Sequence, residues 1–127
     1  MKHEETTEKI IGVFFAVYNE LGQGFLESVY EESMAIALRE AGLHVVQQAP
    51  ITVHFRGQLV GDFRADLLVN DEIIVELKAA RAIDNAHEAQ LMNYLRATRI
   101  EVGLLMNFGS KADFKRFIFD NERKDRR

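Results

Sequence analysis

The stretch from Asp66 to Lys78 constrains this chain most, because it holds two apolar segments around a short polar turn. Leu67–Val69 and Ile73–Val75 are aliphatic on both strand faces, which is typical of strands in the middle of a covered sheet. Yet Asp66, Glu76 and Lys78 bound these segments. Buried charges cost much free energy unless they are paired or bind a metal. We therefore predict a buried β-hairpin whose charged residues form a functional site.

The length of the hairpin loop decides where Asp66 lies, because a one-residue slip moves a side chain to the other face. A two-residue loop would pair Asp66 with Val75 and leave the aspartate among aliphatic side chains. If Glu72 also belongs to the loop, Asp66 pairs with Glu76, and three-residue loops with a bulge are common hairpin connections. We predict this second register.

Glu76 and Lys78 are two residues apart, so they share a strand face, while Leu77 points to the other. With Asp66 opposite Glu76, two carboxylates and an amine gather on one face. Carboxylates that close repel each other unless a cation lies between them. All-oxygen coordination suits Mg²⁺ or Mn²⁺, so this face is a candidate metal site.

Composition indicates one soluble globular domain over residues 1–127, since 47% of the 127 residues are hydrophobic and 28% charged. The net charge of −4 argues against an overall electrostatic hold on nucleic acid but leaves room for a local basic patch. The absence of cysteine excludes disulfides and thiolate metal sites. The apolar run Ile10–Tyr18 is too short to span a bilayer, so we expect a cytoplasmic protein with no membrane partner.

Two helical patterns precede the strands. The first runs from about Thr6 to Leu21, with Thr6 or Thr7 as N-cap, and the second from Phe25 to Ala41 after a break at Gly22 and Gly24. The expected packing residues are Ile10, Phe14, Val17 and Leu21 in the first helix, and Leu26, Val29, Ile36 or Ala37, and Leu38 in the second.

Glu27 and Tyr30 share a face near the start of the second helix. A glutamate in a first turn complements the helix dipole, and a tyrosine three residues on commonly packs on its stem. By itself the pair does not indicate a function.

The remaining elements follow from alternation and turn signals. We predict an edge-like strand over His44–Phe55, which contains Pro50, then a turn and a strand over Leu59–Val69, giving three antiparallel strands in a row. Ile100–Phe108 and Phe114–Phe119 form a second hairpin. The charged tail, residues 120–127, is expected to be frayed and solvated.

Asp84 is the expected N-cap of a helix over Asn85–Ala97, which packs through Leu91 and Leu95. Gln90 and Tyr94 lie on an adjoining stripe and could reach the strand end that carries Glu76 and Lys78; the alternative is a surface glutamine beside a half-buried tyrosine. His87 could join this stripe and is a weak candidate, since the segment lacks the second histidine of a zinc-protease helix.

Taken together, Asp66, Glu76-x-Lys78 and Gln90-x-x-x-Tyr94, in this order on these element types, resemble the PD-(D/E)XK nuclease superfamily. Gly24-x-x-Glu27-x-x-Tyr30 resembles the signature of the small bacterial GxxExxY proteins. The one departure is Ala65, which stands where the motif has proline. The resemblance covers nearly the whole chain and implies an α/β (α+β) fold with a mixed central sheet flanked by helices.

The resemblance also implies a role for each residue. Asp66, Glu76 and the Leu77 backbone carbonyl would bind Mg²⁺ or Mn²⁺, joined by Glu27, which would serve both the metal and catalysis. Lys78 would be the catalytic lysine, Gln90 and Tyr94 would be further catalytic residues that support the site, and Gly24 and Tyr30 would have supporting roles. The implied partner is nucleic acid, DNA rather than RNA.

The leading hypothesis is therefore a metal-dependent nuclease. The runner-up is a catalytically inactive module of the same fold that binds nucleic acid or a protein partner. A structural ion pair between Glu76 and Lys78 is a third interpretation, but it does not explain Asp66. An apolar edge strand would permit a homodimer, although no residue identifies an interface.

Overall fold

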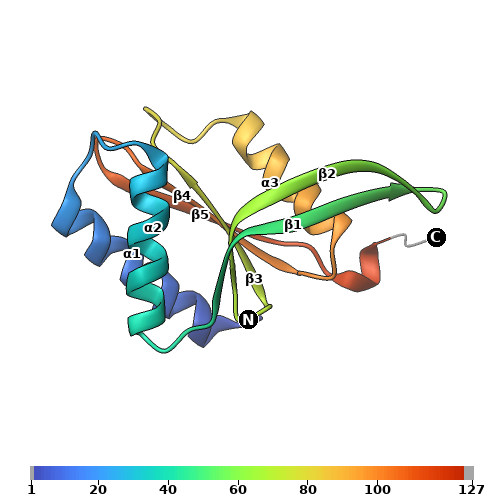
Figure 1. The fold of residues 1–127 in the computed structure, drawn as a ribbon, viewed down its shortest axis with the longest axis horizontal. Coiled ribbons are helices and arrows are strands. Elements are labelled where there is room, and N and C mark those ends of the chain that lie inside the picture. The colour runs from blue at the N-terminus through green and yellow to red at the C-terminus, as the bar shows by residue number, and fades with distance from the viewer. Residues whose placement is uncertain (1, 125–127) are drawn as a thin grey trace.

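The computed structural model describes residues 2–124 and shows three helices around one five-stranded sheet (Figure 1). The elements in chain order are α1 Glu4–Leu21, α2 Glu27–Glu40, β1 Val45–Phe55, β2 Gln58–Val69, β3 Ile73–Lys78, α3 Asn85–Ala97, β4 Val102–Phe108, β5 Ala112–Ile118 and a final 3₁₀ turn, Asn121–Arg123. No helix within residues 2–124 is long and apolar enough to cross a membrane.

The sheet is mixed, with the strand order β1-β2-β3-β4-β5. All neighbouring pairs are antiparallel except β3 and β4, which run parallel and are joined through α3. β2 and β5 flank the parallel pair, each as the antiparallel hairpin partner of its neighbour. β1 therefore lies at one edge of the sheet, as its proline predicts. This confirms the predicted fold class.

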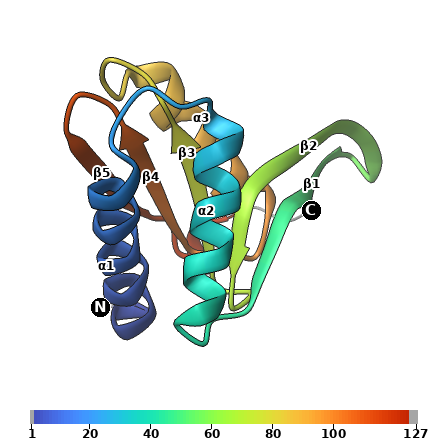
Figure 2. The same ribbon diagram turned by 60° about the vertical axis from the view of Figure 1, so that its left-hand side comes forward.

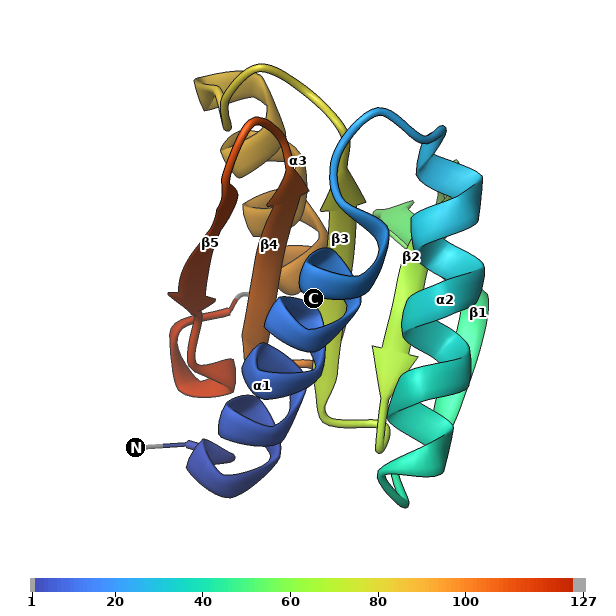
Figure 3. The same ribbon diagram turned by 90° about the vertical axis from the view of Figure 1, so that its left-hand side faces the viewer.

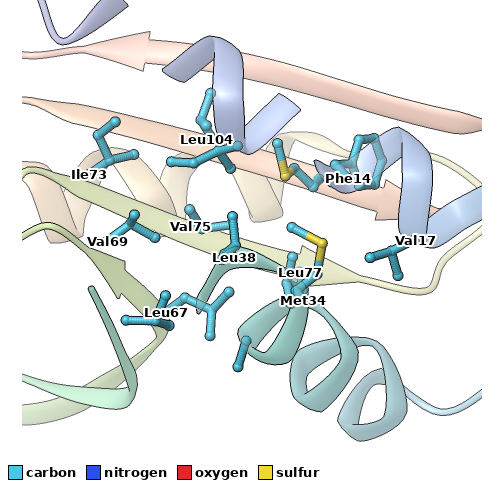
Figure 4. Close-up of a cluster of buried hydrophobic side chains, with 14 of the residues drawn as sticks. Phe14, Val17, Met34, Leu38, Leu67, Val69, Ile73, Val75, Leu77 and Leu104 are labelled. Atoms are coloured by element: carbon cyan, nitrogen blue, oxygen red, sulfur yellow. The ribbon is translucent and has the colours of Figure 1, made fainter. Parts of the chain in front are cut away.

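Helices cover both faces of the sheet. Figures 2 and 3 show α1 and α2 side by side on one face and α3 on the other. Beneath α1 and α2 lies the larger apolar cluster, to which Phe14, Met34, Leu67 and Leu77 contribute (Figure 4). The smaller cluster lies under α3 and includes Leu91. Because alternate residues of β3 enter opposite clusters, this strand is buried on both faces.

The hairpin between β2 and β3 has the predicted three-residue loop. Leu67 pairs with Val75 and Val69 with Ile73, leaving residues 70–72 as the loop. Within the loop Asn70 and Asp71 have positive φ angles of 53° and 54°. The Asn70 Oδ1 accepts a hydrogen bond from the His44 backbone N–H at 2.8 Å, which ties the loop to the start of β1. Continuing this register places Asp66 opposite Glu76.

The packing face predicted for α2 is wrong in part. Leu26 precedes the helix and is 76% exposed, and Ile36 is 56% exposed, whereas Tyr30, Met34 and Leu38 are fully buried. These three recur at four-residue intervals and so form a single stripe. Leu38 and Ala37, the predicted alternative to Ile36, do pack in the core, whereas Tyr30 was missed because it carries a hydroxyl, which has its own hydrogen-bond partners.

The start of the first helix also differs from prediction. Helix α1 begins at Glu4 with His3 as N-cap, and Thr7 is a buried helical residue and Thr6 lies within the first turns. In the part of the charged tail that the structure describes, Lys124 Nζ donates to the carbonyls of Thr98 and Ile100 at 3.1 and 2.8 Å, and the predicted fraying of residues 120–127 stays a prediction. Residues 125–127 of the predicted tail lie outside the described residues.

The outer half of the β1–β2 hairpin extends beyond the helices (Figures 1 and 2). We call residues 53–63 the hairpin arm. Its tip, Arg56-Gly57, has positive φ at both residues, 50° and 77°, as a two-residue type I′ turn requires. Four of its apolar side chains are about half exposed or more: Phe55 60%, Leu59 59%, Val60 62% and Phe63 46%.

Candidate active site

Two carboxylates end the ladder between β2 and β3. Past the Leu67–Val75 pair, the Asp66 backbone N–H donates to Glu76 Oε2 at 2.7 Å, and the Leu77 backbone N–H donates to Asp66 Oδ2 at 2.8 Å. Each strand thus offers a side-chain acceptor to the amide of the other. The three-residue loop thus keeps Asp66 away from the aliphatic side chains. It brings the carboxylates of Asp66 and Glu76 into the same gap between the strands.

Burial raises the pKa of both carboxyl groups. Desolvation and, next, the charge of Asp66 raise the pKa of Glu76 to about 8, although the hydrogen bond from the Asp66 amide opposes this. Glu76 is only 4% exposed. Burial likewise raises the pKa of Asp66, against the hydrogen bond from Leu77. The pair is therefore unfavourable as two bare anions, and a positive charge placed between them would stabilise it.

Lys78 and the Leu77 carbonyl complete the strand end. Lys78 is half-buried, and its positive charge lowers the pKa of both carboxyls, as a smaller effect than burial. Within residues 2–124 it forms no ion pair shorter than 4.0 Å. The N–H and C=O of a strand residue face the same side, so the Leu77 carbonyl faces β2 together with the amide that Asp66 accepts.

Glu27 approaches the same strand end from the start of α2. Its Oε2 accepts a hydrogen bond from the Ala79 backbone N–H at 3.1 Å, and its negative charge contributes to the raised pKa of Asp66 and Glu76. Its side chain is exposed. Glu27 thus lies at the edge of the carboxylate pair, where it binds the amide of Ala79, the residue after Lys78.

Glu31 is a residue that sequence reasoning missed. It lies one turn after Glu27 on the same face of α2, and its charge raises the pKa of Asp66 more than that of Glu27 does. Its Oε2 accepts a hydrogen bond from Gln47 Nε2 at 3.1 Å. The four-residue interval from Glu27 was the signal that could have identified it.

Gly24 and Tyr30 shape the connection between α1 and α2. The Tyr30 hydroxyl donates to the Gly22 carbonyl at 2.6 Å and accepts from the Phe25 amide at 3.3 Å, while its ring stacks on Phe108 at 4.0 Å between centroids. Gly24 has a φ of +106°, which side-chain-bearing residues rarely adopt. Both residues therefore hold the loop that presents Glu27, and neither contacts the carboxylates.

Gln90 and Tyr94 reach the site from α3. Tyr94 is buried, and burial followed by the charges of Glu76 and Asp66 raises its pKa, while a hydrogen bond from the Gln90 side chain lowers it. Gln90 is exposed. Tyr94 is thus close enough to the carboxylates to feel their charges, and Gln90 is linked to them through its hydrogen bond with Tyr94.

His87 belongs to the helix cap. The His87 amide donates to Asp84 Oδ1 at 2.9 Å, and the Asp84 amide donates to His87 Nδ1 at 3.3 Å. This is a capping box with histidine in the position usually held by glutamate or glutamine. It confirms Asp84 as N-cap and gives His87 a structural explanation.

The donor set fits a hard divalent cation of modest protein coordination. No group of three or more histidine, cysteine or acidic residues within residues 2–124 is arranged as a metal cage. The carboxylates of Asp66 and Glu76 and the Leu77 carbonyl are all oxygen donors. Mg²⁺ suits such a site, because it retains waters and binds through one or two carboxylates plus substrate phosphates.

The chain is an α+β protein, in which a mixed five-stranded sheet between helices brings the carboxylates of Asp66 and Glu76 into one gap between two adjoining strands. Residues 4–117 match the family model of the PD-(D/E)XK nuclease superfamily, so the chain belongs to that superfamily. Nucleases of this superfamily generally use divalent metal ions. No curated protein matches.

Among solved structures, the chain is similar to "SSO0001", with a TM-score of 0.59 and 17% identity over 73% of this chain and 50% of that one. It thus spans half the length of that chain. It is also similar to an alkaline exonuclease from Laribacter hongkongensis, with a TM-score of 0.54 and 11% identity over 96% of this chain and 73% of that one. These likenesses concern the fold.

Proposed function

We propose that this chain is a Mg²⁺- or Mn²⁺-dependent nuclease that hydrolyses phosphodiester bonds of nucleic acid, DNA rather than RNA. The observation that carries the proposal is the pair of crossed hydrogen bonds just past the Leu67–Val75 pair, in which the Asp66 amide donates to Glu76 Oε2 and the Leu77 amide donates to Asp66 Oδ2. Membership of a nuclease superfamily supports it. We further assign the chain to the GxxExxY group on Gly24, Glu27 and Tyr30.

Asp66, Glu76 and the Leu77 carbonyl would hold the ion, because they are the oxygen donors that border the gap between the strands. Such an ion, when bound, lowers the pKa of a coordinated water and neutralises charge on a phosphate. Binding it also relieves the repulsion between the two carboxylates. The gap between Asp66 and Glu76 would therefore favour a bound cation.

Lys78 would stabilise negative charge on the reacting phosphate or on the leaving oxygen. Its ammonium lies beside both carboxylates and is free of an ion pair within residues 2–124, so it can turn to a substrate anion. Glu27 would orient a water at the edge of the site, where its carboxylate already accepts the Ala79 amide. Gln90 and Tyr94 would support the metal site from α3.

The test is incubation of the purified protein with single- and double-stranded DNA and RNA in Mg²⁺, Mn²⁺ or chelator. We expect metal-dependent cleavage that is lost in Asp66→Asn, Glu76→Gln and Lys78→Ala proteins. Lys9→Ala is the matched control, since Lys9 is an exposed lysine on α1, outside the site. Cleavage that persists in all three variants would refute the proposal.

Calorimetry with Mn²⁺ separates this function from a non-catalytic module. Metal binding without turnover on any nucleic acid would favour a domain that only binds nucleic acid or a protein. Cell fractionation tests the accompanying proposal that the protein is cytoplasmic.

A further inference from the structure

A largely apolar pocket lies between the hairpin arm and α3, next to the proposed metal site. It has a volume of about 580 Å³ and is lined by Val53 and Phe63 from the arm and by Ala86, Ala89 and Tyr94 from α3. The amides of Gln90 and Asn93 complete the lining, and no lining residue is charged. We call this the α3 pocket. Its volume is in the range of small-molecule sites.

The α3 pocket adjoins the carboxylate gap because the two share residues and a strand. Tyr94 lines the pocket and is close enough to Glu76 and Asp66 for their charges to raise its pKa, and Gln90 lines the pocket and forms a hydrogen bond with Tyr94. Phe63 precedes Asp66 by three residues on β2, which is at most roughly 10 Å at about 3.3 Å per residue. A group in the pocket therefore lies within roughly three stacked nucleotides of a phosphate at the carboxylates, at about 3.4 Å per nucleotide.

Phe63 is 46% exposed but has contacts on the side of the pocket. Its ring contacts that of Tyr94 at 6.1 Å between centroids, with 44° between the planes. A Cβ at Gly61 would come within 2.7 Å of the Phe63 Cε2, so the glycine makes room for the ring. The arm thus presents an aromatic face toward the pocket.

We propose that the α3 pocket takes one unpaired base of the nucleic acid, stacked on the exposed face of Phe63, close to the bond that the metal site cleaves. This inference rests on the proposed function. A nucleic acid has a charged phosphate, a polar sugar and a flat apolar base, and only the base suits an uncharged pocket with an aromatic wall. Gln90 and Asn93 offer donors and acceptors to its edge.

The proposal implies a class of substrate. In a duplex the bases face each other inside the stack, so a base reaches the α3 pocket only from a single strand, a frayed end or a flipped nucleotide. Stacking tolerates every base, because each has a π-face. The expected substrate is therefore single-stranded or end-frayed nucleic acid, with little sequence preference.

The test uses an oligonucleotide that carries the fluorescent base 2-aminopurine, moved stepwise along a single strand. Quenching at one position is expected with the unaltered protein and with Phe63→Tyr, and is expected to be lost with Phe63→Ala. Phe55→Ala is the matched control, because Phe55 is a 60% exposed aromatic residue of the arm that does not line the pocket. Equal quenching in Phe63→Ala protein would overturn the inference.

Cleavage of strands with a single abasic nucleotide gives a second readout. At the sensitive position we expect a loss of about 5- to 150-fold in kcat/KM, the range expected from base stacking on an aromatic residue. Phe63→Ala protein should show no further loss from the abasic nucleotide. Equal losses in both proteins would overturn the inference.

The two proposals fail in distinguishable ways. Quenching that depends on Phe63 without any turnover would retain the base site and refute the nuclease. Turnover that is unchanged both by Phe63→Ala and by the abasic nucleotide would support the nuclease proposal and refute the base site. If Phe63→Ala instead converts a dimer to a monomer in sedimentation, a second copy covers the pocket and the inference is wrong.

Discussion

Replacing Glu76 by glutamine should stabilise the metal-free protein, and more so as the pH rises. The Glu76 carboxyl holds its proton more tightly in the folded protein, where its pKa is about 8, than in the unfolded chain, where the ordinary value is 4.5. Protonation therefore favours folding. The stability that this carboxyl contributes is complete below about pH 4.5 and is lost as the pH rises through 8.

The magnitude follows from the difference between the two pKa values. At roughly 1.4 kcal/mol for each pH unit, the loss amounts to about 3 kcal/mol by pH 7 and about 5 kcal/mol above pH 9. Burial also raises the pKa of Asp66, so its contribution has the same sign. Glutamine keeps the shape of the side chain without the charge, so this part of the pH dependence should disappear.

The assay is urea unfolding in chelator at pH values from 5 to 9, comparing unaltered, Glu76→Gln and Glu40→Gln proteins. Glu40 is an exposed glutamate at the end of α2 and serves as the control. We expect the Glu76→Gln protein to gain several kcal/mol over the others at pH 9 and to converge with them near pH 5. Saturating Mn²⁺ should stabilise only the proteins that retain Glu76.

Parallel stability curves for the three proteins would refute the reasoning. They would mean that the Glu76 carboxyl is hydrated in the folded protein and that no stored repulsion favours a cation.

Four further predictions concern single residues. Lys78→Ala should lower kcat at least about 100-fold while calorimetric Mn²⁺ binding persists, because the lysine acts on the substrate anion; unchanged kcat would contradict this. Asp84→Ala should cost about 1 kcal/mol in urea unfolding through loss of the α3 cap, and His87→Gln should leave cleavage unchanged, because its ring serves the cap. Tyr30→Phe should cost about 1 kcal/mol by freeing the Gly22 carbonyl, and an unchanged melting temperature would disprove that role.

The register of the central hairpin could be predicted because a single argument excluded the alternative. A two-residue loop would have buried Asp66 among aliphatic side chains, whereas a three-residue loop placed it opposite Glu76. The sequence carries this information in the strict two-residue period of a strand. The N-cap at Asp84 could also be predicted from the sequence, because a capping side chain binds a backbone amide only three residues away.

Features that depend on contacts between residues far apart in the sequence could not be predicted. The buried stripe of α2 runs through Tyr30, whose ring stacks on Phe108, 78 positions later, so local hydrophobicity did not identify Tyr30 and left open whether Ala37 or the exposed Ile36 packs. Lys124 Nζ likewise donates to the carbonyls of Thr98 and Ile100, more than 20 positions earlier. The α3 pocket arises where β2 passes beside α3, which no local pattern predicts.

The crossed bonds between each carboxylate and the amide of the other strand give this site its own spectroscopic reporters. The amide protons of Asp66 and Leu77 each bond to an oxygen that would face the cation. When that oxygen shares its electrons with a metal, both amide resonances will move, in a protein that carries no label other than nitrogen-15. Titration followed at these two signals would then separate occupancy of the site from every later event on the substrate.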